Sequence, residues 1–338
     1  MDSNLQSSGD TIGFPGELRQ QYVSDVAELG NALDAWFAVY EQLTPGPFQG
    51  STHELWIGDG VEVLRETGSQ TIFTTGRNKP GTSTIGVPVP FEQTGIYCGT
   101  SLKGIAVAYL PGGTEFEILA REKFDIVSAT VDTALLASFA TELGETLHTD
   151  DRHERPSVLA RTDEAGVLRQ ALLEIICAVD ANPGLLRFAA TRIAMRDCVL
   201  TIALDLLGRK TRRDKWHLPR SHKCWLVRSV RDYVLSHADE TPSLAALCAH
   251  FGVSRRSIQY AFVEHTGMNV ARFLRHTRLN AVHRAIVRSA TLGDGESIAS
   301  LAARWGFWHL PRFAIYYREL FGELPSESRR RGSKTFGL

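Results

Sequence analysis

The feature that most constrains this chain is a pair of short apolar stripes with helical spacing, found near its C-terminus. Residues 243–278 read SLAALCAHFGVSRRSIQYAFVEHTGMNVARFLRHTR. Leu244 and Leu247 mark the first stripe, Gly252 interrupts it, and Ser254 occupies the N-cap position of a second helix. Two short helices joined by a tight turn that contains Gly form a helix-turn-helix. The stretch therefore predicts one such unit.

A second copy of the pattern follows at residues 297–331, SIASLAARWGFWHLPRFAIYYRELFGELPSESRRR. Ile298 and Leu301 form its first stripe, and Gly306 marks its turn. Residues 269–288 have the period and length of one connecting helix. One copy alone is equally typical of a surface helical hairpin. The repeat favours a tandem helix-turn-helix domain.

The second helix of the first unit carries side chains that suit base recognition. In a helix-turn-helix this helix lies in the major groove of DNA and contacts base edges with its first turns. Arginine pairs bidentately with guanine, and glutamine pairs with adenine. The candidates for base contact in the first unit are Arg255, Arg256, Gln259 and Tyr260.

The corresponding helix of the second unit is less polar. Its candidates for base contact are Leu310, Ala314 and Ile315, which can touch a thymine methyl group but cannot form bidentate hydrogen bonds. Pro311 is tolerated only in the first turn of a helix, so this helix is predicted to begin near Leu310. The second unit is therefore expected to contribute little sequence discrimination.

Arginines around the two units are candidates for contacts with DNA phosphates, which position a protein without specifying sequence. A stiff connecting helix can place both reading helices in successive major grooves, about 34 Å apart on one face of the duplex. Each arginine could equally be a solvated surface charge. The candidates are Arg272, Arg275, Arg304, Arg312 and Arg318.

The C-terminal hundred or so residues resemble the DNA-binding domain of the AraC/XylS transcription regulators. The resemblance implies a DNA-binding activator of transcription with promoter DNA and RNA polymerase as partners. Where the family usually has Ser and Arg in the second reading helix, this chain has Pro311 and Ile315. The landmarks that carry the resemblance are Gly252-Val253-Ser254, Phe262, Gly267, Arg278-Leu279, Ile298-Ala299, Gly306-Phe307, Phe313, Gly322 and Pro325.

The charge of the chain is divided unevenly along its length. Residues 209–338 contain 23 Lys and Arg against 10 Asp and Glu, whereas residues 1–208 contain 14 against 28. A basic C-terminal part suggests a polyanionic partner for that part only. The five cysteines form no CxxC pair, which indicates neither a zinc site nor a disulfide framework and favours a reducing compartment.

The first half of the chain has the pattern of a β domain. Residues 1–15 are expected to be a loose tail, residues 24–33 a short helix, and residues 36–43 either a continuation of that helix or a first strand. Short runs rich in Val, Ile, Thr and aromatic residues follow, separated by Gly and Pro turns, which predicts a small barrel or sandwich. The predicted strands are 53–57, 61–65, 71–74, 105–110 and 116–119.

This first half also resembles, more weakly, the cupin-like sensor domain of several AraC-type regulators, the ethanolamine-operon type among them. Metal-binding cupins use several His with a Glu, but His53 stands alone here, so neither a metal nor another cofactor is expected. A small barrel can enclose one ligand. The candidates for binding it are Trp56, Phe73, Arg77 and Tyr97, although the three aromatics could be ordinary core residues and Arg77 exposed.

From residue 132 the pattern becomes helical, with predicted helices at 132–143, 164–179 and 183–207. In related regulators, helices at this position pair two chains, which implies a homodimer. The alternative is that they are lid helices on the barrel. A charged run, RKTRRDK at 209–215, follows as a solvated linker. It could instead contact DNA phosphates, or bind an anionic nucleotide through Arg209 and Arg213.

The sequence therefore predicts a multidomain α+β chain in three parts: residues 1–208 for effector sensing and dimerisation, 209–220 as a basic linker, and 221–331 for DNA binding. The predicted function is sequence-specific transcription regulation controlled by a small-molecule or nucleotide effector. An effector-independent architectural DNA-binding protein and a cupin-class enzyme fused to a DNA-binding domain are the alternatives. No catalytic motif, signal peptide or apolar run of membrane-spanning length occurs, so a cytoplasmic, non-enzymatic protein is expected.

Overall fold

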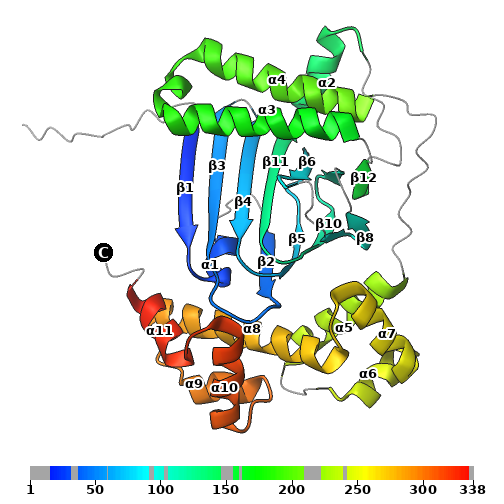
Figure 1. The fold of residues 1–338 in the computed structure, drawn as a ribbon, viewed down its shortest axis with the longest axis vertical. Coiled ribbons are helices and arrows are strands. Elements are labelled where there is room, and N and C mark those ends of the chain that lie inside the picture. The colour runs from blue at the N-terminus through cyan, green and yellow to red at the C-terminus, as the bar shows by residue number, and fades with distance from the viewer. Residues whose placement is uncertain are drawn as a thin grey trace, which may run out of the picture.

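The computed structural model describes residues 16–31, 37–58, 60–90, 95–102, 106–145, 155–159, 162–208, 222–238 and 242–334. Twelve strands and two antiparallel sheets account for most of the described N-terminal half, and helices account for the C-terminal part (Figure 1). The predicted division into a β-rich part with helices and an all-helical part is confirmed. The predicted tail at 1–15 and the basic linker, with Arg209 and Arg213, lie outside the described residues.

The larger sheet has seven strands in the order β1-β3-β4-β11-β6-β9-β12, all paired antiparallel. Its long central strands carry Val and Ile at alternate positions, the pattern of a strand with one face in an apolar core. The strands are β1 (Glu17–Val23), β3 (Gly50–Gly58), β4 (Val61–Gly68), β6 (Thr82–Pro88), β9 (Val107–Pro111), β11 (Phe124–Asp132) and β12 (Ser157–Leu159).

The smaller sheet has five strands in the order β2-β5-β10-β7-β8, also antiparallel. The predicted alternatives for residues 36–43 are decided in favour of a strand, because Phe37–Gln42 pairs with β5 along its whole length. The strands are β2 (Phe37–Gln42), β5 (Ile72–Arg77), β7 (Gly95–Tyr97), β8 (Thr100–Leu102) and β10 (Glu115–Ala120).

Helices α2 (Thr133–Glu142), α3 (Thr162–Ala181) and α4 (Ala189–Gly208) pack against the seven-stranded sheet, with α3 and α4 crossing its strands (Figure 1). Asp132 caps α2, since its carboxylate accepts hydrogen bonds from the backbone N–H groups of Ala134 and Leu135. The residues that form this apolar core include Leu55, Val63, Ile85, Val127, Leu168, Leu172, Ile176, Val199 and Leu200.

One predicted element is divided in the structure. The expected helix at 183–207 consists of a 3-10 helix, η2 (Pro183–Arg187), followed by α4. Asn182 caps η2 through a bond from the backbone N–H of Gly184, and Phe188 adopts an extended conformation that ends it. An extended residue cannot continue a helix, so the prediction of one continuous helix is wrong. Strands β1, β6, β7, β8, β11 and β12 are not among the predicted strands.

The C-terminal part contains seven helices among the described residues. They surround α8, which runs along the lower side of the β domain in Figure 1. Between the β strands and these helices, α1 (Val26–Asn31) contributes to the contact with α8. The helices are α5 (His222–Ser236), α6 (Leu244–Phe251), α7 (Arg255–Thr266), α8 (Val270–Leu292), α9 (Ile298–Arg304), α10 (Leu310–Phe321) and α11 (Pro325–Lys334).

The two parts share an apolar core. Phe73 of β5 meets Phe273 of α8 edge to face, with 5.8 Å between ring centroids. Leu119 of β10 and Leu43 are fully buried in the same cluster as Leu247 and Phe262 of the C-terminal helices. The helical part therefore packs directly against the five-stranded sheet.

Buried ion pairs join the same two surfaces. The guanidinium of Arg231 on α5 donates to Glu41 of β2 at 2.8 Å, and the side chains are 5% and 0% exposed. Gln42 exchanges backbone hydrogen bonds with the Asn280 side-chain amide on α8, both at 2.9 Å. Asp25 accepts from His283 of α8 at 2.6 Å and from Arg331 of α11. No helix among the described residues is both long and apolar enough to span a membrane.

Replacing Arg231 by Met tests the importance of these pairs. The substitution keeps an apolar stem but leaves the carboxylate of Glu41 buried without its closest cation. Losing one partner of a buried pair costs about 3–5 kcal/mol. We expect the free energy of unfolding of the full chain to fall by that amount in urea denaturation.

Arg330→Met is the matched control, because Arg330 is 74% exposed and its pair with Glu327 spans 3.9 Å. Exposed pairs contribute at most about 1 kcal/mol. Equal losses of stability in the two variants would contradict a structural role for the Arg231–Glu41 pair.

Candidate nucleic-acid interface and ligand pocket

The first helix-turn-helix unit consists of α6 and α7. Helix α6 ends at Gly252, whose φ of 62° lies in the left-handed region that favours glycine. Ser254 then caps α7, since its hydroxyl accepts a hydrogen bond from the backbone N–H of Ser257 at 3.0 Å. Ile258 and Phe262 are fully buried. This packing fixes which face of α7 points outward.

The outward face of α7 carries the predicted base-contacting residues. Arg255 and Arg256 are exposed, Tyr260 is 62% exposed, and Gln259 is half-buried. The ammonium group of Lys223 on α5 lies 4.8 Å from the centre of the Tyr260 ring. Two guanidinium groups, an amide and a phenol are thus presented together at the start of the helix.

The second unit consists of α9 and α10. Helix α10 begins at Leu310, as Pro311 predicted, and the side chain of His309 caps it. Phe313 and Tyr317 are buried against α8 and α9, which leaves Ile315 64% exposed. Leu310 is exposed and Ala314 half-buried. The outward face of α10 is therefore largely apolar.

Trp308 extends this apolar face and was not predicted as a contact residue. It lies in the turn just before α10 and is 86% exposed, which is unusual for so large an apolar side chain. Its position in the turn of a helix-turn-helix is the sequence signal that could have identified it.

The predicted phosphate-contacting arginines occupy different environments. Arg272 and Arg318 are exposed. Arg275 of α8 lies 4.4 Å from the centre of the Tyr316 ring, and Arg312 donates to the hydroxyl of Tyr316 at 2.8 Å. Arg304 forms an ion pair with Glu296 at 2.5 Å, so its charge is already partly neutralised.

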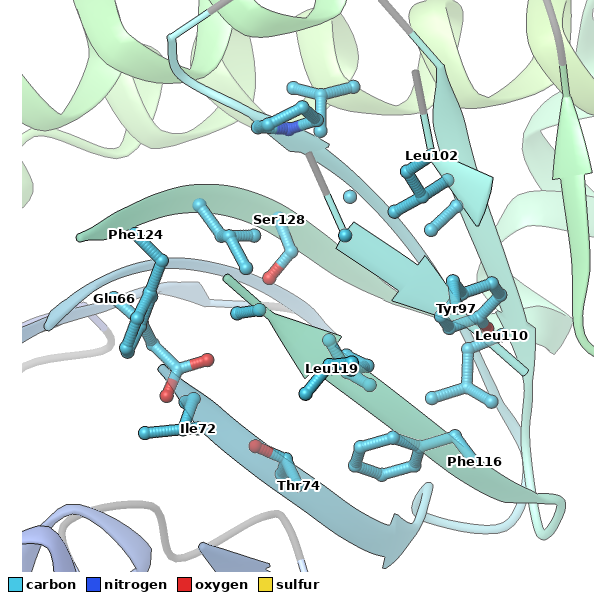
Figure 2. A pocket seen from close by; sticks show the side chains of 18 of the residues that line it. Glu66, Ile72, Thr74, Tyr97, Leu102, Leu110, Phe116, Leu119, Phe124 and Ser128 are labelled. Atoms are coloured by element: carbon cyan, nitrogen blue, oxygen red, sulfur yellow. The ribbon is translucent and has the colours of Figure 1, made fainter. Parts of the chain in front are cut away.

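A cavity of about 100 Å³ lies between the two sheets of the N-terminal part (Figure 2). Its walls are mostly apolar, and no Lys, Arg or His lines it. Alternate residues of single strands form the walls, such as Phe116, Ile118 and Ala120 of β10. The polar side chains that line it are Tyr40, Glu66, Thr74, Thr84, Tyr97 and Ser128.

Glu66 of β4 provides the one carboxyl group that lines the cavity, and Figure 2 shows it directed into the space. The hydroxyl of Tyr40 donates to its Oε1 atom at 2.6 Å. Burial raises the pKa of Glu66 to about 7, although the hydrogen bond from Tyr40 acts in the opposite direction. Near neutral pH the group can therefore both donate and accept a hydrogen bond.

Of the predicted effector-binding residues that the structure describes, only Tyr97 lines this cavity, and its hydroxyl donates to the backbone carbonyl of Tyr109 at 2.8 Å. Trp56 instead lies beside Arg19, whose guanidinium is 4.9 Å from the ring centre. Phe73 faces the C-terminal helices. Arg77 is exposed and paired with Glu115 at 3.2 Å. Glu66 and Tyr40 were missed, because a lone polar residue in a strand gives no sequence signal.

Comparison with protein families matches residues 247–331 to the family described as "Helix-turn-helix domain". The "Probable thc operon regulatory protein" of Rhodococcus erythropolis is 30% identical over 136 residues, which are 40% of each protein. The "XylDLEGF operon transcriptional activator" of Pseudomonas putida is 36% identical over 105 residues, 31% of this chain and 32% of that protein. The chain thus matches well under half the length of these two curated relatives.

Among solved structures, a probable AraC family transcriptional regulator from Rhodopseudomonas palustris is 32% identical to this chain. The match covers 32% of this chain and 96% of that protein, with a TM-score of 0.28. The AraC-like transcriptional activator CuxR is 15% identical and covers 73% of this chain and 84% of its own, with a TM-score of 0.33.

The raised pKa of Glu66 predicts a specific pH dependence. Between pH 4.5 and 7 this carboxyl is ionised in the unfolded chain but still protonated in the folded one, so stability falls as the pH rises through that window. A shift of this size corresponds to about 3 kcal/mol. Glu66→Gln removes this titrating group. Between pH 4.5 and 7.5 the free energy of unfolding of the wild type, measured with urea, should therefore fall by about 3 kcal/mol relative to that of the variant.

Glu142→Gln, on the exposed end of α2, should follow the wild-type curve across the same range. If the free energy of unfolding changed with pH in the same way for the wild type and for Glu66→Gln, the predicted raised pKa of Glu66 would be wrong.

Proposed function

We propose that the protein is a transcription regulator of the AraC/XylS type that binds promoter DNA through α7 and α10, which lie within the residues matched to the helix-turn-helix family. The observation that carries this proposal is the placement of two reading helices on either side of α8. At 1.5 Å per residue this 23-residue helix is about 34 Å long, close to one turn of B-DNA. The sequence-specific regulator is favoured over the architectural protein by the polar, exposed face of α7.

The cavity supports control by a small molecule. Pockets that bind small molecules are mainly apolar, with a few polar groups that orient the ligand. Its volume of about 100 Å³ is of the same order as the roughly 150 Å³ apolar cavity that accommodates benzene. The effector we propose is an uncharged, largely apolar molecule of that scale, with one polar group that hydrogen-bonds to Glu66.

The same lining argues against an anionic effector. A carboxylate or phosphate would have to be buried beside Glu66 without a cation in the wall, and an unpaired buried charge is strongly unfavourable. A nucleotide is disfavoured in this cavity for the same reason. Among the lining residues no Ser or Thr hydroxyl is paired with a His or a carboxylate, which favours a sensor over an enzyme.

A homodimer and RNA polymerase remain proposed partners, and the cytoplasm the proposed location. Helices α3 and α4 cover the side of the β domain opposite the C-terminal helices (Figure 1), so pairing through them would leave α7 and α10 accessible to DNA. Phe188 and Ile193, at and near the start of α4, are 63% and 45% exposed and favour such a contact. Activation is favoured by the named role of the relatives from Pseudomonas putida.

The proposal predicts that the two helix-turn-helix units contribute unequally to the recognition of DNA bases. Binding sites selected from random duplexes with the full chain should contain two elements about 10 bp apart. Arg256→Ala should cost about 1–3 kcal/mol of affinity and relax the preference at one position, because a bidentate contact is lost. Quantitative binding with mutated sites measures both effects.

Ile315→Ala is the comparison in the second unit and should change base preference little, because it makes no polar contact. Arg272→Ala should instead weaken all sequences alike and lower the slope of log affinity against log salt by about 1. A larger change in base preference from Ile315 than from Arg256 would reverse the assigned roles of the units.

The effector proposal predicts discrimination by charge. Among benzyl alcohol, benzamide, benzoate and benzylamine, the two neutral compounds should raise the melting temperature of the full chain and benzoate should not. Glu66→Gln should reduce the shift, since its amide cannot switch between donor and acceptor at one atom. Differential scanning fluorimetry measures both.

Glu142→Gln should leave the shifts unchanged. Stabilisation by benzoate alone would reject the proposed ligand class, and stabilisation by benzylamine alone would assign a cationic effector paired with ionised Glu66.

A further inference from the structure

Three potential metal ligands meet at the interface between the five-stranded sheet and the C-terminal helices. Glu117 comes from β10, Cys224 from α5 and His265 from α7, and all three are buried. The Nε2 atom of His265 lies 2.7 Å from Oε1 of Glu117, and Sγ of Cys224 lies 3.4 Å from the same oxygen. Their candidate ligand atoms all fall within 4.8 Å of one another.

These distances are close to those of a tetrahedral zinc site. With Zn–S of about 2.3 Å and Zn–O and Zn–N of about 2.0–2.1 Å, tetrahedral angles place S and O about 3.5 Å apart and N and O about 3.3 Å apart. The sulfur of Cys224 already has this spacing from Glu117. The spacing between Nε2 of His265 and Oε1 of Glu117 would have to widen by about 0.6 Å to admit the ion.

A second observation points to a missing ligand. The Oε2 atom of Glu117 is buried without a hydrogen-bond partner in the structure, on a residue that is 2% exposed. An unpartnered buried carboxylate oxygen is unfavourable by several kcal/mol in general. A metal ion bound to this carboxylate would supply the partner.

The other cluster of this kind differs in an informative way. Asp25, His283 and Glu323 also come together, but Arg331 forms ion pairs with both carboxylates, and His283 is bonded to Asp25 and to Tyr317. That cluster already contains its cation. Arg228 interacts electrostatically with Glu117, but its guanidinium pairs with Glu115 and Asp232. Arg121 reaches the backbone carbonyl of His265, at 3.5 Å, and no ion pair joins it to Glu117 among the described residues.

We propose that Glu117, Cys224 and His265 bind a zinc ion that joins the β domain to the DNA-binding helices. The set of one thiolate, one imidazole and one carboxylate suits a borderline-soft metal such as Zn²⁺ and not Mg²⁺ or Ca²⁺, which prefer oxygen ligands. On binding, the thiol proton of Cys224 passes to solvent, and His265 coordinates through Nε2 with its proton on Nδ1. Water completes the four-coordinate site.

The position of the site gives the metal a structural consequence. It would connect β10 to α5 and to the C-terminal end of α7, the first reading helix. On the opposite face of β10, the neighbours of Glu117 line the ligand cavity. The ion would therefore stabilise the arrangement of the first helix-turn-helix unit on the sheet.

Cobalt substitution tests the site directly in the full chain. Protein freed of metal with a chelator is titrated with Co²⁺, which reports a tetrahedral thiolate site through a near-ultraviolet charge-transfer band and intense visible bands. We expect one equivalent to bind in the wild type and Zn²⁺ to displace it. Cys224→Ser should abolish the charge-transfer band, and His265→Gln and Glu117→Gln should each weaken binding by more than about tenfold.

Cys248→Ser is the matched control, because Cys248 lies on α6 outside the cluster and should leave the titration unchanged. Far-ultraviolet circular dichroism checks that each variant is folded. Absence of the band in the wild type, or its persistence in folded Cys224→Ser, would overturn the proposal. The wild-type result alone decides the matter if a variant does not fold. Neither DNA nor effector is needed, so failure here leaves the proposed function standing.

Discussion

The architecture depends on a five-stranded sheet both of whose faces are buried. Because side chains alternate along a strand, β10 sends Phe116 and Ile118 toward the cavity and Glu117 and Leu119 toward the DNA-binding helices, although Leu119 also borders the cavity. Strands β2 and β5 divide in the same way: Tyr40 faces the cavity and Glu41 the helices in β2, and Thr74 and Phe73 do so in β5. A one-residue slip of register would exchange the two sets. The sheet thus separates the cavity from the C-terminal helices.

Ion pairs between the N-terminal part and the C-terminal helices change how the uneven charge of the chain is interpreted. The excess of basic residues after residue 209 suggests a polyanionic partner, but part of it is neutralised within the molecule. Arg231 is paired with Glu41, Arg228 with Glu115, and Arg331 with Asp25. Among the described residues, Arg255 and Arg256 of α7, Arg272 of α8 and Arg318 of α10 are exposed and form no such ion pair. The distribution of charge within the basic part, more than its total, is what bears on DNA binding.

Local patterns predicted most of the C-terminal part, because caps, glycine turns and apolar stripes are encoded within a few residues of the elements they specify. Ser254, Gly252 and Pro311 each determine a helix end in the way expected. The β domain was predicted as a class, but β1 and β12 were missed, since edge strands with one exposed face carry a weak apolar pattern. Trp56, Phe73 and Arg77 show why the pocket was not found: sequence gives the residue type but not the face of the strand.

Clusters between distant residues are invisible to any search for local motifs. Cys224 and Glu117 are 107 positions apart, and the strand and helices that bring them together are themselves joined only by tertiary packing.

The same packing limits how an effector could act. A ligand shifts the DNA-binding part only through different affinities for two arrangements of the chain. Since close-packed interiors transmit small displacements instead of absorbing them, any movement of β10 or β2 that accommodates a ligand must also move Glu117 or Glu41. The partners of these carboxylates are Arg231 on α5, Arg284 on α8 and His265 on α7, so the contacts of these two strands reach the long helix α8 as well as the first helix-turn-helix unit.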